Sequence, residues 1–274
     1  MNVWLFEDAL TIIKNCIFHL ENPMNNSFSL LNSYFSRLYR RTMHSAYEQA
    51  YEEIALSLMN GGKCLDCGAS GGHHFGVLHG RMGLEQKLYT GIEWDAESVS
   101  IARKKGVNVV QGDLNELLPY EDESFQAVYG LSLLEHLLNG CQWIREVKRV
   151  LIPGGKIVVL TPNISTFFTM ALLLAGKMPS SGPHPDSEVL QKNEMLFNVR
   201  EMQQADLESD TPVHRHLVVF SYRALQTYLQ QLGFVKINGY GFGLYPFPNF
   251  LQPLLEKIDP WHCHQMVFSA EKQR

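Results

Sequence analysis

Between residues 63 and 161 the chain alternates short β-branched or apolar runs with segments of helical periodicity. Parallel strands need a crossover connection, usually a helix, so this alternation predicts a doubly wound α/β fold with a parallel sheet and helices on both faces. The predicted strands lie at 63–66, 88–93, 107–111, 127–130 and 156–161, and the helices at 76–83, 96–105, 133–138 and 141–150. Pro153, Gly154 and Gly155 predict the turn into the fifth strand.

The flanking regions divide the chain into four parts. Residues 1–60 carry apolar positions at helical spacing and predict an N-terminal helical extension, and residues 61–162 form the core of the sheet. The pattern is lost over 163–215, where we expect an inserted lid that covers one edge of the sheet. Residues 216–274 complete the sheet with a helix at 223–232 and strands at 234–240 and 265–270.

The composition limits the classes of binding partner and the cellular location that we expect. The 274 residues carry a net charge of −5, which gives no general attraction to phosphate backbones, so we expect no nucleic-acid partner. The five cysteines are scattered and odd in number, which disfavours a disulfide framework. We expect a cytoplasmic protein without an integral membrane segment, because no signal-peptide pattern is present and the apolar stretch 164–175 is too short to span a bilayer. That stretch and the aromatic segment 239–250 leave open a peripheral membrane contact.

The segment 64–72, CLDCGASGG, predicts a strand that ends in a glycine-rich turn. Gly68, Gly71 and Gly72 allow the backbone to turn sharply, and the N-terminus of the next helix favours a bound anion or nucleotide there. The later strands end in GIEWD, in QGDL and in VYGLSLLEH. These chain positions meet at one edge of a parallel sheet, so the sequence predicts a nucleotide-type cofactor site at that edge.

In order and spacing, these motifs resemble those of the class I S-adenosylmethionine-dependent methyltransferases over residues 62–160. The resemblance implies a seven-stranded, mostly parallel Rossmann-like sheet with an antiparallel last strand. It implies that Asp66, Gly68 and Gly72 line the methionine part of the cofactor, Glu93 its ribose and Asp113 its adenine amine. The full set of cofactor-binding residues that it implies is Asp66, Gly68, Ala69, Gly72, Glu93, Trp94, Asp113, Leu114, Tyr129, Gly130 and Leu131.

One residue departs from the family pattern. Ser70 stands where the family has a glycine, and we expect the neighbouring Gly71 to restore the flexibility of the turn. The same change disfavours a nicotinamide cofactor, because a GxGxxG motif counted from Gly68 would require glycines at Ser70 and His73.

Few catalytic groups are expected, because the sulfonium of S-adenosylmethionine already activates the methyl group and catalysis depends on positioning and exclusion of water. His136 is a candidate general base for an acceptor that arrives protonated, and a structural histidine at the start of a helix is the alternative. Glu135 and His216 are candidate substrate-side residues. We expect no metal centre, because neither the Cys64–Cys67 pair nor the histidine pairs have partners at ligand spacing.

The sequence therefore predicts methyl transfer from S-adenosylmethionine to oxygen or nitrogen of a small-molecule, sugar or lipid-like acceptor. The alternatives are a non-catalytic or regulatory protein that keeps the fold and, with less support, a protein or RNA methyltransferase. RNA is disfavoured because no basic face is interleaved with aromatic residues, and Arg37, Arg40 and Arg41 predict a solvated helix face or a contact with anionic headgroups. Planar-amine acceptors are disfavoured because residues 129–132 read YGLS where such members carry an Asn-Pro-Pro-Tyr motif.

Overall fold

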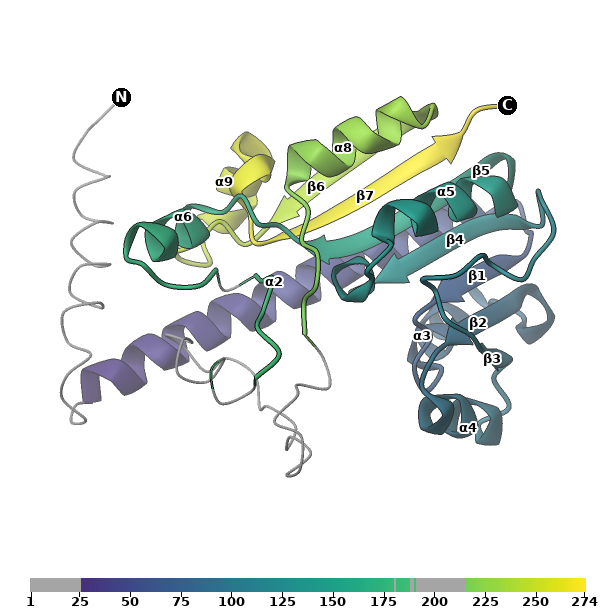
Figure 1. The fold of residues 1–274 in the computed structure, drawn as a ribbon, viewed down its shortest axis with the longest axis horizontal. Helices are drawn as coiled ribbons and strands as arrows, with labels where there is room; N and C mark the ends of the chain where they lie inside the picture. The colour runs from purple at the N-terminus through teal and green to yellow at the C-terminus, as the bar shows by residue number, and fades with distance from the viewer. Residues whose placement is uncertain (1–25, 180, 188–189, 191–214) are drawn as a thin grey trace.

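The computed structural model describes residues 26–179, 181–187, 190 and 215–274. Its centre is a seven-stranded sheet in the order β3-β2-β1-β4-β5-β7-β6 (Figure 1). The strands are β1 (Cys64–Cys67), β2 (Tyr89–Glu93), β3 (Val109–Gln111), β4 (Phe125–Leu131), β5 (Leu151–Pro162), β6 (Phe234–Phe242) and β7 (Gln265–Lys272). Neighbours from β3 to β5 are parallel, and β7 is antiparallel to both β5 and β6. The expected doubly wound fold with a reversed last strand is confirmed.

Helices cover both faces of the sheet. On one face lie α5 (Gly140–Val150) and α8 (Tyr222–Gln231), and on the other lie α2 (Asn26–Leu58), α3 (His73–Met82) and α4 (Ala96–Lys104). Successive β4 residues alternate between the two cores, because side chains of a strand point to opposite faces: Val128 packs with α5, whereas Ala127 and Tyr129 pack on the α2 side. The shorter elements are η1 (Gln86–Leu88), η2 (Leu134–His136), α6 (Phe167–Leu174), α9 (Gln252–Ile258) and η3 (Pro260–His262).

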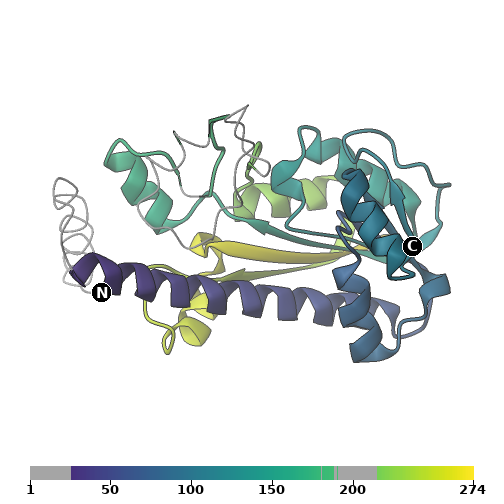
Figure 2. The same ribbon diagram turned by 90° about the horizontal axis from the view of Figure 1, so that it is seen from below.

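The long helix α2 crosses one face of the sheet (Figure 2). Its buried carboxylate Glu53 accepts hydrogen bonds of 2.7 Å from the hydroxyls of Tyr240 in β6 and Ser269 in β7. Nearer to the N-terminus of α2, the guanidinium of Arg41 forms a bidentate ion pair with Glu256 of α9. These contacts fix the N-terminal helix against the late strands. Arg41 is therefore not part of a freely solvated basic face, although Arg37 and Arg40 are exposed.

Two predicted elements differ in the structure. The predicted turn at 153–155 lies inside β5, which begins at Leu151 and breaks register with β4 between the pairs Phe125↔Leu151 and Ala127↔Lys156. Gly154 adopts a φ of +83°, so the strand absorbs the extra residues as a bulge. The predicted helix over 133–138 is the single turn η2.

Other predictions concern parts that are only partly described. The first helical stretch of the extension, within residues 1–25, and the polar helix of the insertion, within 191–214, lie outside the described residues. Within the described residues, no helix combines the length and the apolar character needed to cross a membrane.

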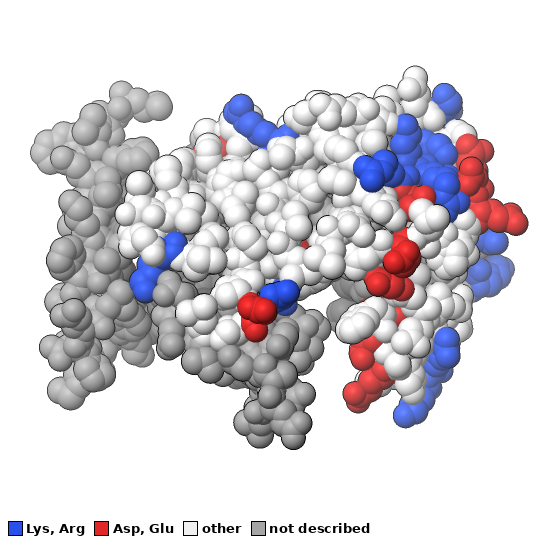
Figure 3. Space-filling model, in the orientation of Figure 1, with Lys and Arg blue, Asp and Glu red and all other residues white. Residues whose placement is uncertain are grey.

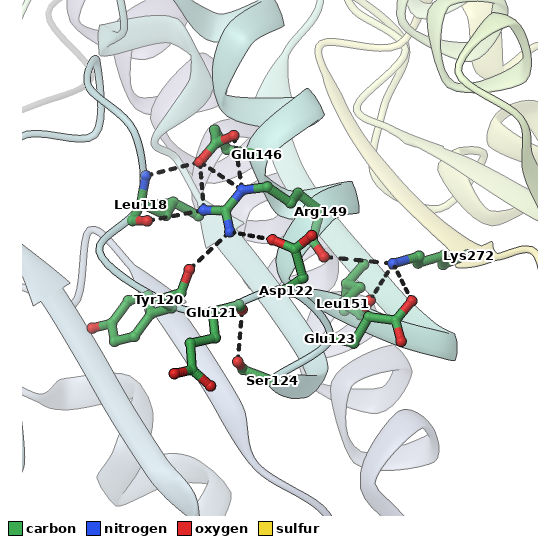
Figure 4. Close-up of polar contacts among 10 residues, drawn as sticks. All are labelled: Leu118, Tyr120, Glu121, Asp122, Glu123, Ser124, Glu146, Arg149, Leu151 and Lys272. Atoms are coloured by element: carbon green, nitrogen blue, oxygen red, sulfur yellow. Dashed lines mark hydrogen bonds and ion pairs between the residues drawn. The ribbon is translucent and has the colours of Figure 1, made fainter.

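A charged network secures the entry into β4 (Figure 4). Arg149, at the end of α5, donates to the carboxylate of Glu146 and, at 2.8 Å each, to that of Asp122 and to the carbonyl of Tyr120. Lys272 in β7 donates to the carbonyl of Leu151 at 2.7 Å. The network ties the segment before β4 to α5 and β7, at the ends of the strands opposite to the glycine turn.

Candidate functional site

The glycine turn has a left-handed backbone at alternate residues. Gly68 and Gly72 have φ values of +79° and +78°, and Ser70 between them has +45°. The expectation that Gly71 restores the flexibility lost at Ser70 is wrong, because Ser70 itself adopts the left-handed conformation and Gly71 does not. The turn is anchored on β2, since the N–H groups of Gly68 and Ala69 donate to the carbonyl of Ile92 at 2.9 and 3.2 Å.

Close packing explains the small residues of the turn. A Cβ at Gly68 would lie 3.3 Å from Leu133, and a Cβ at Gly72 would lie 3.1 Å from Val107. Position 91 in β2 also requires a glycine, because a Cβ on Gly91 would lie 2.6 Å from the Cβ of Ala69. The buried Ala69 therefore holds the turn against β2, and Gly68 places it beside the segment that follows β4.

Glu93 links the turn to the end of β2. Its carboxylate accepts hydrogen bonds from the backbone N–H groups of Ser70 and Trp94 at 2.9 Å and of Asp95 at 3.1 Å. An ionised carboxylate has about four acceptor positions, so these bonds leave capacity for a ligand hydroxyl. Trp94 next to it is exposed. This arrangement fits the expected ribose-binding role of Glu93.

Asp113 and Leu114 follow β3. The exposed carboxylate of Asp113 accepts from the backbone and side-chain nitrogens of Asn115 at 2.8 and 3.0 Å, and Leu114 is buried. The Asn115 side chain then accepts from the backbone N–H groups of Leu138 and Asn139 at 2.8 and 3.0 Å. Asn115, which sequence reasoning missed, thus connects this loop to the one after β4.

Asp66 and Tyr129 differ from expectation. Both side chains are fully buried between β1, β4 and α3, so no ligand atom reaches them in this conformation. The Asp66 carboxylate accepts from the Tyr89 hydroxyl at 2.7 Å and contacts Nδ1 of His74 at 3.2 Å. Their placement corrects the expectation of direct cofactor contact: these side chains support the turn from below. The reason is that β1 and β4 are central strands covered on both faces.

Burial and the charge of Asp66 shift the pKa values of the side chains around it. Burial and the nearby Asp66 carboxylate raise the pKa of Tyr89, so its hydroxyl remains a donor. Burial lowers the pKa of His74, but the Asp66 charge and its hydrogen bond outweigh that effect and leave the pKa above its usual 6.5. Cys64 and Cys67 are buried as well, and burial raises the pKa of the Cys64 thiol to about 12. Their expected structural role fits these surroundings.

Gly130 and Leu131 end β4 and are buried. A Cβ on Gly130 would lie 2.9 Å from both Leu133 and Trp143, so glycine is needed there for packing beneath η2. At the end of β4, Gly130 and Leu131 would therefore present backbone atoms, and not side-chain atoms, to a ligand.

Glu135, His136 and His216 come together beyond the end of β4, although 79 residues or more separate His216 from the other two in the sequence. One ligand-type atom from each lies within 4.8 Å of those of the other two. The backbone N–H of Leu217 donates to the Glu135 carbonyl at 2.7 Å, which fixes the loop segment of His216 against η2. Sequence spacing therefore missed a carboxylate that does stand beside two histidines.

Further groups join this cluster. The Thr161 hydroxyl donates to Glu135 at 2.8 Å, and the ring of His184 stacks on that of His216 with a centroid separation of 4.9 Å. The contact of Thr161 with Glu135 depends on the pairing of β4 with β5, which brings the ends of the two strands together. His184 carried no recognisable sequence signal.

The glycine turn, Glu93 and Asp113 fit a nucleoside-type cofactor. The turn leaves little room for a Cβ at Gly68 and Gly72, and two carboxylates with remaining acceptor capacity follow the neighbouring strands. All of these groups lie at the carboxyl ends of parallel strands, where ligands of open α/β sheets bind.

Comparison with known proteins identifies a domain in the centre of the chain. Residues 65–159 match the family model described as methyltransferase domain. A probable S-adenosylmethionine-dependent methyltransferase from Mycolicibacterium smegmatis is 38% identical over 79 residues, which cover 28% of this chain and 30% of that protein. The phthiotriol/phenolphthiotriol dimycocerosates methyltransferase of Mycobacterium tuberculosis is 31% identical over 114 residues, covering 40% and 42%. The chain thus spans less than half the length of these two relatives.

A solved S-adenosylmethionine-dependent methyltransferase from Thermotoga maritima shares the fold with a TM-score of 0.52, at 18% identity and with coverage of 88% of this chain and 99% of that one. The family model spans the strands β1 to β5 that carry the turn, Glu93 and Asp113. Over residues 65–159 the chain therefore carries a methyltransferase domain, similar to those of S-adenosylmethionine-dependent methyltransferases.

Proposed function

We propose that the protein transfers a methyl group from S-adenosylmethionine to an oxygen or nitrogen atom of a small-molecule or lipid-like acceptor. One observation carries this proposal: Leu133, which contacts the glycine turn, lies just before the cluster of Glu135, His136 and His216 in the chain. A Cβ on Gly68 would be 3.3 Å from Leu133, and Glu135 follows Leu133 by two residues. A cofactor on the turn would therefore have polar groups of the chain close to its reactive end.

The residues that hold the cofactor in this proposal present mainly backbone and carboxylate groups. Gly68, Ala69 and Gly72 form the cradle, Glu93 receives the ribose hydroxyls, and Asp113 with Leu114 receives the adenine. When bound, S-adenosylmethionine supplies a sulfonium-activated methyl group and leaves as S-adenosylhomocysteine once the acceptor has taken that methyl. The chain contributes alignment and exclusion of water.

The acceptor side needs a group that assists loss of a proton, if the acceptor arrives protonated. In this proposal the cluster of Glu135, His136 and His216 assists that step, and His136, the base expected from the sequence, belongs to it. Its Nδ1 contacts the carbonyl of Arg215 at 2.9 Å, so the ring is held in one orientation.

A lipid-like acceptor is supported by exposed apolar side chains on α6 and α9 and in the loop before α9. This apolar end consists of Met170, Leu173, Leu174, Phe250, Leu254 and Ile258. Most of the charged side chains in Figure 3 gather over the opposite end, around β1 to β4 and α5. The similarity to a methyltransferase of phthiotriol dimycocerosates points in the same direction. We therefore include a peripheral membrane contact in the proposal.

Calorimetry with S-adenosylmethionine and S-adenosylhomocysteine tests the cofactor site. We expect both to bind the unaltered protein and both Glu93→Ala and Asp113→Ala to weaken binding about tenfold or more, since each removes hydrogen bonds to a charged acceptor worth about 1.5–3 kcal/mol. Glu97→Ala, which removes an exposed carboxylate of α4, is the matched control and should bind as the unaltered protein does. Absence of binding to the unaltered protein would contradict the proposal.

A second experiment separates an enzyme from a binding protein. The protein is incubated with methyl-labelled S-adenosylmethionine and either the lipid or the water-soluble fraction of a cell extract. We expect label to move into the lipid fraction. Binding of the cofactor without label transfer to either fraction would favour the non-catalytic alternative.

A further inference from the structure

We propose that Glu135, His136 and His216 form a binding site for one divalent transition-metal ion, with Zn²⁺ as the best-matched ion. The three residues each offer a ligand atom within 4.8 Å of the others. Ligand bonds to Zn²⁺ are about 2.0–2.2 Å long, which places tetrahedral ligand atoms roughly 3.4 Å apart. The ligand atoms, within 4.8 Å of one another, would have to approach by up to about 1.4 Å on binding the ion.

Both histidines are held as metal-binding histidines are. Nδ1 of His136 contacts the carbonyl oxygen of Arg215 at 2.9 Å, and Nδ1 of His216 contacts the carbonyl oxygen of Ser181. A carbonyl oxygen only accepts, so Nδ1 carries the proton in each ring and Nε2 carries the lone pair. A backbone carbonyl that fixes the tautomer and the orientation of the ring is the usual outer contact of a metal-binding histidine.

The carboxylate is oriented in the same way. Glu135 is only 2% exposed, and Thr161 donates a hydrogen bond of 2.8 Å to its Oε2. A buried carboxylate is costly to keep ionised unless a cation or several donors compensate its charge. A bound metal ion would add positive charge to the surroundings of this carboxylate. Thr161 then keeps one carboxylate oxygen in place while the other faces the ion.

The donor set selects the kind of ion. Two imidazole nitrogens and one carboxylate oxygen suit Zn²⁺ and similar transition metals, whereas Mg²⁺ and Ca²⁺ prefer oxygen donors throughout. Three protein ligands also leave a coordination position open, as in catalytic zinc sites. The proposed ion therefore has room for one oxygen atom of a water molecule or a substrate.

The site would favour a hydroxyl acceptor, and this consequence rests on the proposed function. A hydroxyl oxygen in the open position would release its proton to water more readily. Its lone pair would then form the bond to the methyl carbon while the carbon–sulfur bond breaks and its electron pair returns to sulfur. The products are a methyl ether, S-adenosylhomocysteine and a proton. His136 would act as a ligand and not as a general base.

Metal binding can be measured without any activity. The full chain is stripped with a chelator and titrated with Zn²⁺ by calorimetry, and with Co²⁺ by visible absorption, which reports nitrogen and oxygen ligands directly. We expect one Zn²⁺ per chain. His216→Ala and Glu135→Gln should weaken binding about 100-fold, and His73→Ala, which removes an exposed histidine of α3, should leave it unchanged. Equal affinity in His216→Ala and the unaltered protein would overturn the inference.

A milder variant guards against loss of folding. Thr161→Val keeps the shape of the side chain and removes only the hydroxyl that orients Glu135, so we expect about 10–100-fold weaker Zn²⁺ binding with unchanged circular dichroism. S-adenosylmethionine binding is measured on the same stripped protein. Cofactor binding without Zn²⁺ binding overturns the metal site alone, whereas Zn²⁺ binding without cofactor binding supports the metal site and contradicts the proposed function.

Discussion

Two buried tyrosines, on the strands β2 and β4 that flank β1, show how differently one residue type can contribute at the residue scale. The Tyr89 hydroxyl donates to the Asp66 carboxylate at 2.7 Å, whereas the Tyr129 hydroxyl is buried without a hydrogen-bond partner among the described residues. We expect Tyr89→Phe to lower the free energy of unfolding by about 1.5–3 kcal/mol, because a buried carboxylate loses a donor. Tyr129→Phe should leave it unchanged or raise it slightly. Urea denaturation of both variants checks this, and equal losses would contradict it.

The backbone of the glycine turn permits a second comparison. Gly68 combines a φ of +79° with a close neighbour in Leu133, so Gly68→Ala should cost about 1–2 kcal/mol and weaken cofactor binding. Ser70 already adopts a left-handed conformation, with a φ of +45°, which is strained for a residue with a side chain. Ser70→Gly relieves that strain but adds about 0.5–1 kcal/mol of unfolded-state entropy, so we expect stability to change by less than about 1 kcal/mol. Thermal denaturation with and without cofactor measures both effects. A large loss in Ser70→Gly would show that the serine side chain itself is needed.

At the scale of elements, the joint between α5 and the segment before β4 depends on one carboxylate. The hydrogen bond from Arg149 lowers the pKa of Glu146 below 4.5, against the opposing effect of burial. A lowered folded-state pKa means that the stabilisation is present above pH 4.5 and is lost as the pH falls through the folded value. Glu146→Gln should therefore reduce stability at pH 7 and flatten its decline below pH 4.5.

Chemical denaturation between pH 3 and pH 7 tests this expectation. Glu121→Gln, in the same segment but with an exposed side chain, is the control and should keep the decline of the unaltered protein. An unchanged pH dependence in Glu146→Gln would mean that other carboxylates govern acid unfolding.

The elements also show what sequence reasoning can reach. The strands β1 to β4 were predicted within about two residues of their ends, because β1, β2 and β4 are largely buried and their apolar runs have few alternatives. β5 was predicted to begin too late, since a Pro-Gly-Gly sequence predicts a turn and gives no sign that a bulge continues the pairing with β4. Helix α9 and η3 lie in an aromatic, proline-rich tail whose local pattern does not indicate helices.

The candidate site also contains residues that can be predicted from the sequence and residues that cannot. Glu93 and Asp113 follow strand ends, and strand ends are readable from the sequence. The burial of Asp66 and the meeting of Glu135 with His216 depend on how strands and loops pack in space. No spacing rule connects residues 135 and 216, which are joined by the hydrogen bond from Leu217 to Glu135. For this reason the sequence indicated the cofactor better than the acceptor side.

At the scale of the whole molecule, chemistry and surface character are separated along the sheet. The cofactor-side strands β1 to β3 lie at one end, and α6 and α9 lie at the other (Figures 1 and 2). Charged side chains gather over the first end (Figure 3). The net charge of −5 opposes attraction to anionic membranes, so a membrane contact would depend on apolar burial.

This separation predicts binding to uncharged lipid vesicles through the apolar end. The full chain should cosediment with phosphatidylcholine vesicles, and high salt should not release it, because apolar burial is not screened. Leu174→Asp and Phe250→Asp, at side chains that are 82% and 80% exposed, should each abolish cosedimentation without loss of stability. Leu117→Asp, 68% exposed beyond β3 at the other end, is the matched control and should sediment normally. Binding that occurs only with anionic vesicles and disappears at high salt would instead implicate Arg37 and Arg40 and contradict an apolar contact.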